Sequence, residues 1–272
     1  MKKTVLFRVK GGPSIGFGHI ARSRVLVKTL QNRFGVRAKL SINSDKEGKA
    51  DIVVLDYPGA KKEDTKAKRV IVMDDLLARK RFVIIDDSIK KASHKIVNKT
   101  AKRVLVSMGG ADPYELTLLF LQYIEEMKAD DLIVDVIVGP YFSNVKGLEK
   151  FAANTSLKIN LHKNVKKLNP YIKKADLAII ASGVTMHECA AARLPALVIC
   201  HWPKWEMFKF RKFMACGTAR SLGHYTEINF EKFRREFSRS LDYAARSEML
   251  KKAGKFNRLD DKIKIAKLIL NS

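Results

Sequence analysis

The sequence predicts an α/β protein with two Rossmann-like, doubly wound domains that face each other across a cleft. Short apolar runs alternate with helical patterns along the whole chain, which is typical of parallel sheets. Each half begins with an apolar strand that runs into a glycine-rich turn. With 272 residues, of which 46% are hydrophobic, the chain can bury the cores of two modest domains. We therefore expect an N-terminal domain over 1–100 and a C-terminal domain over 101–272.

In the first half, five apolar runs have the length and composition of strands, and one long helical pattern follows the first run. The expected strands are 4–9, 37–42, 51–55, 69–73 and 81–85, and the main helix is 20–33. Acidic residues follow three of these runs, at Asp56, Asp74-Asp75 and Asp86-Asp87. Parallel sheets place their sites at such strand ends, but helix N-capping is the default expectation for each carboxylate.

The second half repeats the alternation of strands and helices. Its expected strands are 104–107, 132–138, 157–161, 177–181 and 196–200, and the basic tail from Phe230 onwards has a helical pattern. Asp112 and Pro113 follow the first of these strands. We expect Asp112 to cap a helix that carries Pro113 in its first turn.

The formal net charge of +25 is extreme, and the lysines that cause it are spread along the whole chain. Such a charge suits nucleic acid, an anionic membrane surface or a dianionic nucleotide sugar, and it also occurs on heat-adapted proteins in general. Basic and aromatic residues are not interleaved as in RNA-recognition motifs, so nucleic acid is not favoured. We interpret the charge mostly as background that steers anionic ligands. A peripheral membrane contact through the basic surface stays open.

Several classes of protein are disfavoured by composition. No apolar run is long enough to span a bilayer, and the basic N-terminus lacks the apolar segment of a signal peptide. We therefore expect a cytoplasmic protein without an integral membrane segment. Cys189, Cys200 and Cys216 are odd in number and lack C-x-x-C spacing, which argues against a disulfide framework and a zinc site. The sequence predicts neither a metal nor a cofactor.

The segment Ile15-Gly16-Phe17-Gly18-His19-Ile20 follows the first strand and predicts a strand–turn–helix arrangement. Such a turn offers free backbone N–H groups to an anion, and Gly16 and Gly18 let phosphates approach the backbone closely. His19 can move protons near neutral pH. The spacing fits neither G-x-G-x-x-G nor a P-loop. We infer an enzyme acting on a phosphorylated or nucleotide-linked substrate; the alternative is a tight turn with a solvated histidine.

A second candidate phosphate site follows the strand 177–181, where Ser182 and Gly183 open a helix. Backbone N–H groups there point at a phosphate, and the hydroxyls of Ser182 and Thr185 can assist. Glu188 suits the two hydroxyls of a ribose, or alternatively stabilises the helix dipole. Further on, His201 with Trp202 and Trp205 suits a sugar platform, and equally suits packing against the next helix.

These motifs together resemble a known family. Phe7-Arg8, the segment 15–20 and Arg22 are similar to the N-terminal signature of the UDP-2,4-diacetamido-2,4,6-trideoxy-β-L-altropyranose hydrolases of pseudaminic acid biosynthesis. The segment 106–112 resembles the opening of that family's second domain, and 182–195 resembles both that family and the MurG-type N-acetylglucosaminyltransferases. The resemblance implies a GT-B-like fold, a UDP-sugar substrate, and release of UDP by water with inversion at the anomeric carbon.

The resemblance also implies roles for individual residues. His19 is expected to act as general base or to orient the water. The expected site residues are His19 and Tyr57 for catalysis, Gly16, Gly18, Gly109, Gly110, Ser182, Gly183, Thr185 and Glu188 for the nucleotide and its phosphates, and Arg8, Arg22, Trp205 and Glu206 for the sugar. The chain departs from the family at Asp56-Tyr57-Pro58-Gly59, where the tyrosine is displaced by one position, and at 201–206, where only Glu206 is retained.

Two alternatives accompany the hydrolase hypothesis. A GT-B glycosyltransferase would use the same site with a hydroxyl acceptor in place of water, and a basic surface would suit a membrane-bound acceptor. A non-catalytic protein that binds a nucleotide sugar or nucleic acid is the other alternative, because the sugar-pocket loops are changed. Retention of His19 argues against it.

Overall fold

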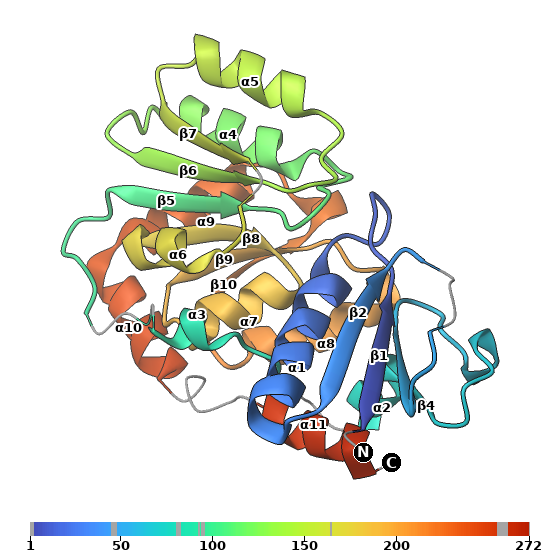
Figure 1. The fold of residues 1–272 in the computed structure, drawn as a ribbon. Coiled ribbons are helices and arrows are strands. Elements are labelled where there is room, and N and C mark those ends of the chain that lie inside the picture. The colour runs from blue at the N-terminus through green and yellow to red at the C-terminus, as the bar shows by residue number, and fades with distance from the viewer. Residues whose placement is uncertain are drawn as a thin grey trace. The chain divides into compact units, whose positions relative to one another are not determined.

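The computed structural model describes residues 3–44, 48–79, 83–91, 93, 96–163, 165–254 and 261–271. The chain forms two compact units: unit 1 comprises residues 1–86 with 260–272, and unit 2 comprises residues 87–259. Unit 1 contains a four-stranded sheet and unit 2 a six-stranded sheet, and every strand pair described is parallel (Figure 1). The predicted α/β class with two parallel sheets is therefore confirmed.

The sheet of unit 1 has its first strand in an inner position. Its strands are β1 (Thr4–Val9), β2 (Arg37–Ile42), β3 (Ile52–Asp56) and β4 (Val70–Val72), in the order β2-β1-β3-β4. The chain adds β2 on one side of β1 and then β3 and β4 on the other. The strand order therefore reverses between β1 and β3, and open α/β sheets bind their ligands at the carboxyl edge of such a switch point. At that edge Val9 lies opposite Asp56.

Helices cover one face of this sheet. They are α1 (Gly18–Phe34), α2 (Met73–Arg79) and α11 (Lys262–Asn271). Apolar residues of alternate strand positions, such as Phe7 and Val54, pack against Leu26 and Leu30 of α1 in this core. Strand alternation turns the intervening residues to the opposite face, where Val53, Leu55, Tyr57 and Val72 form a second small cluster beside the turn η1 (Lys62–Asp64).

Two expectations for the N-terminal half differ from the structure. The division expected at residue 100 leaves helix α11 in the second domain, whereas α11 packs in unit 1, because Ile265 and Ile269 fill the apolar face beside α1. The expected strand 81–85 is not seen over 83–85, and residues 81 and 82 lie outside the described residues. The backbone of Val83 instead bonds to Asp261, to its side chain at 3.1 Å and to its N–H at 2.8 Å.

The sheet of unit 2 is also doubly wound. Its strands are β5 (Arg103–Ser107), β6 (Ile133–Val138), β7 (Lys158–Lys163), β8 (Leu177–Ala181), β9 (Ala196–Cys200) and β10 (Arg220–His224), in the order β10-β9-β8-β5-β6-β7. The switch point lies between β5 and β8, because β6 and β7 are added on one side of β5 and the later strands on the other. Strand β10 was not predicted, since its register is interrupted between Ser221 and Gly223 and Leu222 is its one large apolar residue.

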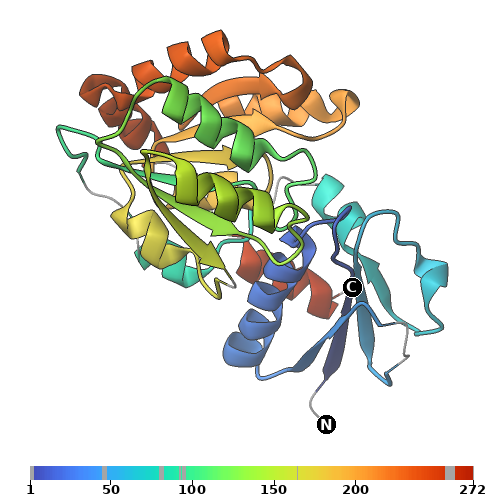
Figure 2. The ribbon, with the colours of Figure 1, turned by 90° about the horizontal axis from the view of Figure 1, so that it is seen from above.

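Helices pack on both faces of this second sheet. On one face, α4 (Leu116–Glu126), α5 (Val145–Asn154) and α9 (Phe230–Leu241) supply Phe120, Leu148 and Phe233 to the core. Helices α4 and α5 lie side by side in Figure 2. On the other, α3 (Asp87–Lys91) contacts both α6 (Asn169–Lys174) and α7 (Val184–Ala191), which packs against β8 and β9 (Figure 1). The helices α8 (Met207–Met214) and α10 (Tyr243–Ala253), and the turns η2 (Lys204–Glu206) and η3 (Tyr225–Glu227), complete the unit.

The start of α4 corrects one expectation. The helix begins at Leu116, so Pro113 lies in the preceding turn rather than in the first helical turn. The carboxylate of Asp112 nevertheless accepts the N–H groups of Leu116 and Thr117, at 2.9 and 2.8 Å, and so caps the helix from a position with φ of 49°. Across the described ranges, none of the helices combines the length and the apolar character that crossing a bilayer requires.

The place of α11 in the core of unit 1 can be tested with two substitutions on the same helix. Ile265 is fully buried, whereas Leu268 is 41% exposed. We expect Ile265→Ala to lower the free energy of unfolding by about 3 kcal/mol, because it leaves a cavity against α1, and Leu268→Ala to change it by less than about 0.5 kcal/mol. Urea unfolding of the full chain measures both values. Equal, small effects would show that α11 is not part of this core.

Candidate functional site

The glycine-rich segment after β1 is a closed loop. Gly12 and Gly16 exchange two backbone hydrogen bonds, with N···O distances of 3.3 and 2.7 Å. A Cβ at Gly11 would lie 2.5 Å from Cδ1 of Ile20, so the loop folds closely over the first turn of α1. Gly18 opens that helix, and Phe17, which has no side-chain acceptor, occupies its N-cap position. The loop therefore ends where α1 begins, and His19 is the second residue of that helix.

His19 is held by a buried carboxylate. Its Nδ1 lies 2.9 Å from Oδ1 of Asp56, the last residue of β3, whose side chain has no exposed surface. Two further residues on the same face of α1 bind this carboxylate: Ser23 donates its hydroxyl to Oδ2 at 2.6 Å, and Nε of Arg22 lies 3.0 Å from each oxygen. Positions 19, 22 and 23 are neighbours on one helix face, because they are three and four residues apart.

The contacts of Nδ1 are the basis on which we assign the tautomer of His19. Burial alone raises the pKa of a carboxylate, but hydrogen bonds from His19 and Arg22 hold the pKa of Asp56 below its ordinary value. Nδ1 of His19 lies 2.9 Å from Oδ1 of Asp56 and 3.0 Å from Nη2 of Arg22. Because the ionised carboxylate only accepts hydrogen bonds and Arg22 also binds Asp56 directly, we assign the ring proton to Nδ1. We assign the second ring nitrogen, Nε2, as the basic one. In the part of the chain that the structure describes, Nε2 has no hydrogen-bond partner, and the side chain is 17% exposed.

Asp56 is the residue of this candidate site that sequence reasoning did not single out. The sequence shows it as one of several carboxylates after apolar strands, each expected to cap a helix. The structure gives Asp56 a different part, because β3 pairs with β1 and so brings its carboxyl end beside the start of α1. Two features could have indicated Asp56 as a site residue: it ends a strand, and that strand lies at the switch point of the sheet.

The structure places Arg22, Arg8 and Tyr57 in two different environments. The guanidinium of Arg22 binds Asp56 and also Asp74, whose Oδ1 lies 3.2 Å from Nη2, so this side chain links the two carboxylates. Arg8 and Tyr57 lie on the opposite face of the sheet from His19. Strand alternation causes this, because the residues next to Arg8 in β1 point into the α1 core.

That opposite face forms a second polar cluster around Asp64. The Tyr57 hydroxyl donates to Oδ2 of Asp64 at 2.8 Å, and Nη1 of Arg8 donates to the Asp64 carbonyl at 2.9 Å. The Nζ of Lys10 lies 4.6 Å from the centre of the Tyr57 ring. The N–H of Lys61 and the Tyr57 hydroxyl lower the pKa of the Asp64 carboxyl. The structure therefore does not bring Tyr57 together with His19.

In unit 2, the first glycine loop lies at the switch point of the sheet. Gly109 has φ of 86°, a conformation that residues with a Cβ rarely adopt. A Cβ at Gly139, just after β6, would lie 2.5 Å from the carbonyl oxygens of both Gly109 and Gly110. The N–H of Tyr141 also donates to the Gly110 oxygen at 2.9 Å. The Gly109-Gly110 turn is thus held tightly against the end of the neighbouring strand.

The second loop of unit 2 follows β8, the neighbour of β5. Gly183 precedes α7 with φ of 141°, which favours glycine, and Thr185 and Glu188 lie in the first two turns of this helix. The Ser182 hydroxyl accepts the N–H of His201 at 3.2 Å and lies 3.1 Å from Nδ1 of the same residue. Ser182 is therefore engaged with His201 through its hydroxyl and with the carbonyl of Ile199 through its N–H, at 2.8 Å.

His201 follows β9 and joins this edge. The ring of His201 shares a hydrogen bond with the Ser182 hydroxyl through Nδ1. Burial, with a contribution from His224, lowers the pKa of His201 to about 4, so the ring is neutral near pH 7. His224, at the end of β10, bonds through Nδ1 to Thr226 at 2.7 Å and through Nε2 to the Trp202 carbonyl at 3.0 Å. The neighbouring strands β8, β9 and β10 are thus followed or ended by Ser182, His201 and His224, and Ser182 and His201 are hydrogen-bonded to each other.

The two remaining expected sugar residues lie in the turn η2. Trp205 is 71% exposed. The Glu206 carboxylate forms an ion pair with Nζ of Lys209 at 3.2 Å. Among the described residues, no group of three or more histidine, cysteine, aspartate or glutamate side chains is arranged to hold a metal ion.

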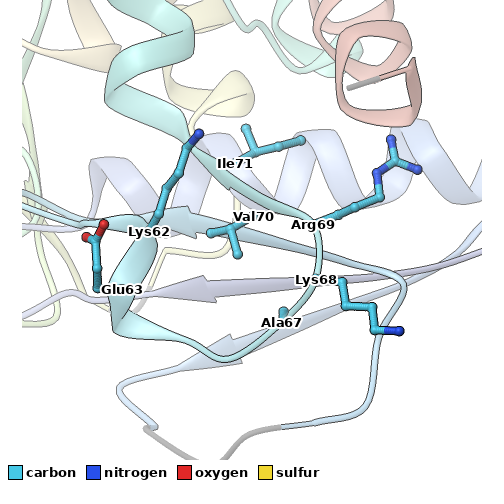
Figure 3. Close-up of a pocket in the computed structure, with 7 residues that line it drawn as sticks. All are labelled: Lys62, Glu63, Ala67, Lys68, Arg69, Val70 and Ile71. Atoms are coloured by element: carbon cyan, nitrogen blue, oxygen red, sulfur yellow. The ribbon is translucent and has the colours of Figure 1, made fainter.

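A surface pocket elsewhere in unit 1 does not share these features. It lies beside the edge strand β4, and the ends of Lys62, Lys68 and Arg69 around it point in different directions (Figure 3). Arg69 donates to the carbonyl of Leu270 in α11 at 3.4 Å. The cations around this pocket do not converge on a common point, so we assign it no functional role.

The buried histidines of unit 2 predict a pH dependence of stability. Burial lowers the pKa of His187, like that of His201, to about 4, whereas an unfolded histidine titrates near pH 6.5. Between these values the unfolded chain binds protons that the folded chain does not, so stability falls as the pH decreases from about 6.5 to about 4. Each histidine accounts for about 3 kcal/mol of that loss.

Urea unfolding at a series of pH values measures this loss. His201→Gln keeps an acceptor for Ser182 and should reduce the acid-induced loss by about 3 kcal/mol. The control is His162→Gln, which removes a histidine paired with Asp135 at 2.8 Å and should leave the loss undiminished. An unchanged loss in His201→Gln would contradict the neutral, buried state assigned to this ring.

Comparison with known proteins establishes the fold. No protein-family model matches the chain. An uncharacterised protein of Methanocaldococcus jannaschii is 32% identical over 104 residues, which are 38% of this chain, and the chain matches 21% of that protein's length. MurG of Acinetobacter baumannii matches with a TM-score of 0.64 and 14% identity, over 99% of this chain and 100% of that one.

Two other solved structures also have a fold similar to that of this chain. A structure described for EarP-mediated arginine glycosylation of translation elongation factor EF-P has a TM-score of 0.62 and 11% identity over the full length of both chains. A UDP-N-acetylglucosamine 2-epimerase has a TM-score of 0.54 and 12% identity, over 99% of this chain and 95% of that one. At these identities the likeness concerns the fold alone. The chain has a GT-B-like fold.

Proposed function

We propose that the protein is a nucleotide-sugar hydrolase that releases UDP from a UDP-linked amino sugar of the diacetamido-trideoxy class. The observation that carries the proposal is the His19–Asp56 pair at the switch point of unit 1, with 2.9 Å between Nδ1 and Oδ1. A histidine fixed by a buried carboxylate through one nitrogen offers the other as a general base. The GT-B-like fold, shared with MurG and a UDP-N-acetylglucosamine 2-epimerase, supports a nucleotide sugar as the substrate.

The proposed reaction needs one proton acceptor and a stabilised leaving group. Nε2 of His19 takes a proton from water as the water oxygen bonds to the anomeric carbon, on the side opposite the diphosphate. The bond from that carbon to the phosphate oxygen breaks, and its electron pair leaves with UDP. Asp56 stabilises the imidazolium that forms, because its negative charge lies next to Nδ1. The anomeric configuration is inverted.

Unit 2 supplies the proposed contacts to the nucleotide. The Gly109-Gly110 turn and the N–H groups from Gly183 into α7 lie on neighbouring strands, β5 and β8, and offer backbone donors to the diphosphate. His201 adds a neutral imidazole ring next to Ser182. Glu188, one turn further along α7 than Thr185, is the proposed partner of the ribose hydroxyls. Glu206 remains the proposed sugar contact in η2.

A glycosyltransferase is the second candidate. It is favoured by the glycosyltransferases among the structures that share the fold, such as EarP. In this reaction a hydroxyl group of an acceptor takes the place of water, and His19 removes its proton in the same way. The two candidates differ in one observable: a transferase releases UDP only when its acceptor is present.

The proposal predicts UDP release without an acceptor. A panel of UDP-sugars that includes 2,4-diacetamido-trideoxy forms is incubated with the full chain, and free UDP is followed. We expect release that falls by about 10²-fold or more in His19→Ala, because general-base catalysis is lost. His162→Gln is the matched control, since it breaks a similar histidine–carboxylate pair in unit 2.

Each outcome decides between the candidates. Binding of UDP without release from any donor would contradict hydrolysis and favour the transferase. Release that persists in His19→Ala, with binding of UDP intact, would contradict the assigned base. Circular dichroism of each variant shows that folding is retained.

A further inference from the structure

An exposed aromatic and basic surface lies on the segment after β9, where η2 leads into α8. Trp205 is 71% exposed and Phe208 is 62% exposed, and these are the most exposed aromatic side chains in the described part of the chain. The Nζ of Lys209 lies 5.9 Å from the centres of both rings, so the three side chains are neighbours. Lys212 is exposed one helical turn further along. We call these four residues the aromatic–basic face.

The helical period explains why these side chains share one surface. Residues 205, 208, 209 and 212 are spaced i, i+3, i+4 and i+7, which places them on one side of a helix. The opposite side of α8 is anchored in unit 2 by Phe210 and Phe213, which are 1% and 7% exposed. The exposed rings are therefore not required to hold the helix in place. Large apolar side chains grouped on a surface are typical of an interaction site.

The charge around the rings indicates the chemistry of the partner. Segment 202–212 contains Lys204, Lys209, Arg211 and Lys212 but a single acid, Glu206, and the whole chain carries a net charge of +25. Lys204, Arg211 and Lys212 are exposed together with the two rings. Exposed aromatic rings next to positive charges match a partner that has an apolar layer beneath negative charges. A bilayer that contains acidic lipids has this structure.

We propose that the aromatic–basic face docks the protein on an anionic membrane surface. Trp205 and Phe208 insert at the level of the lipid headgroups, while Lys209 and Lys212 keep their ammonium groups among the phosphates. Helix α8 then lies parallel to the membrane plane. This assignment replaces the sugar contact expected of Trp205. It goes beyond the proposed function, because membrane docking requires no nucleotide sugar.

Single-stranded nucleic acid also combines negative charge with apolar surface, because its bases are exposed. Proteins that bind single strands without sequence preference combine aromatic stacking with a basic groove that follows the backbone. Here the rings are exposed three residues apart, and the structure places Lys209 beside both of them. The arrangement favours a broad anionic surface over a strand.

The test is cosedimentation of the full chain with vesicles of phosphatidylcholine, with and without phosphatidylglycerol. We expect binding to the acidic vesicles that weakens as salt is added, because exposed charges are screened. Trp205→Ser with Phe208→Ser should lower the bound fraction at least about tenfold, because the inserted rings are lost. The control is Tyr243→Ser, which removes a 49% exposed aromatic ring from α10 and should leave binding unchanged.

Tryptophan emission locates the contact independently. The chain has two tryptophans, so Trp202→Phe leaves Trp205 as the one reporter. We expect its emission to shift to shorter wavelength on addition of acidic vesicles. Equal vesicle binding by the wild-type chain and the double variant would overturn the proposal, as would unchanged Trp205 emission on binding. Emission that responds to a single-stranded oligonucleotide but not to vesicles would assign the face to nucleic acid instead.

Discussion

The candidate active site of unit 1 depends on the hydrogen bonds that the buried carboxylate of Asp56 accepts. A charged group without exposed surface is stable only when its oxygens accept hydrogen bonds, and His19, Arg22 and Ser23 supply them. Because these three residues lie on one face of α1, the same contacts hold the helix against β3. The geometry that orients His19 is therefore also part of what holds unit 1 together, and Asp56 cannot be replaced without affecting both.

Sheet topology explains where the other candidate residues gather. In each unit the strand order reverses once, between β1 and β3 and between β5 and β8. The loops that leave these strands at their carboxyl ends diverge and leave backbone N–H groups accessible. Unit 1 places His19 and Asp56 there, and unit 2 places the Gly109-Gly110 and Ser182-Gly183 turns there. The same architectural rule thus places the candidate base of unit 1 and the candidate anion-binding turns of unit 2 at equivalent edges of their sheets.

Much of this organisation could be predicted from the sequence, because it depends on local patterns. The strands β1, β2, β8 and β9 have the bounds that their apolar runs indicate, and the glycine turns after β1 and β8 are read directly from neighbouring residues. Long-range features could not be predicted in this way. Asp56 and His19 are in contact although they are 37 residues apart in the sequence. Tyr57 points to the other face of the sheet because successive side chains of a strand alternate between the two faces. The irregular strand β10 and the return of α11 to unit 1 likewise depend on packing that local sequence does not encode.

The most direct test of the account is the protonation of the His19 ring, measured by nitrogen NMR on protein with labelled histidine. The account predicts that in the neutral ring the proton resides on Nδ1, that Nε2 then has the chemical shift of an unprotonated nitrogen, and that Asp56→Asn abolishes this preference. A neutral ring with its proton on Nε2, or a tautomer that does not respond to Asp56→Asn, would contradict the assignment of His19 as a base oriented by Asp56.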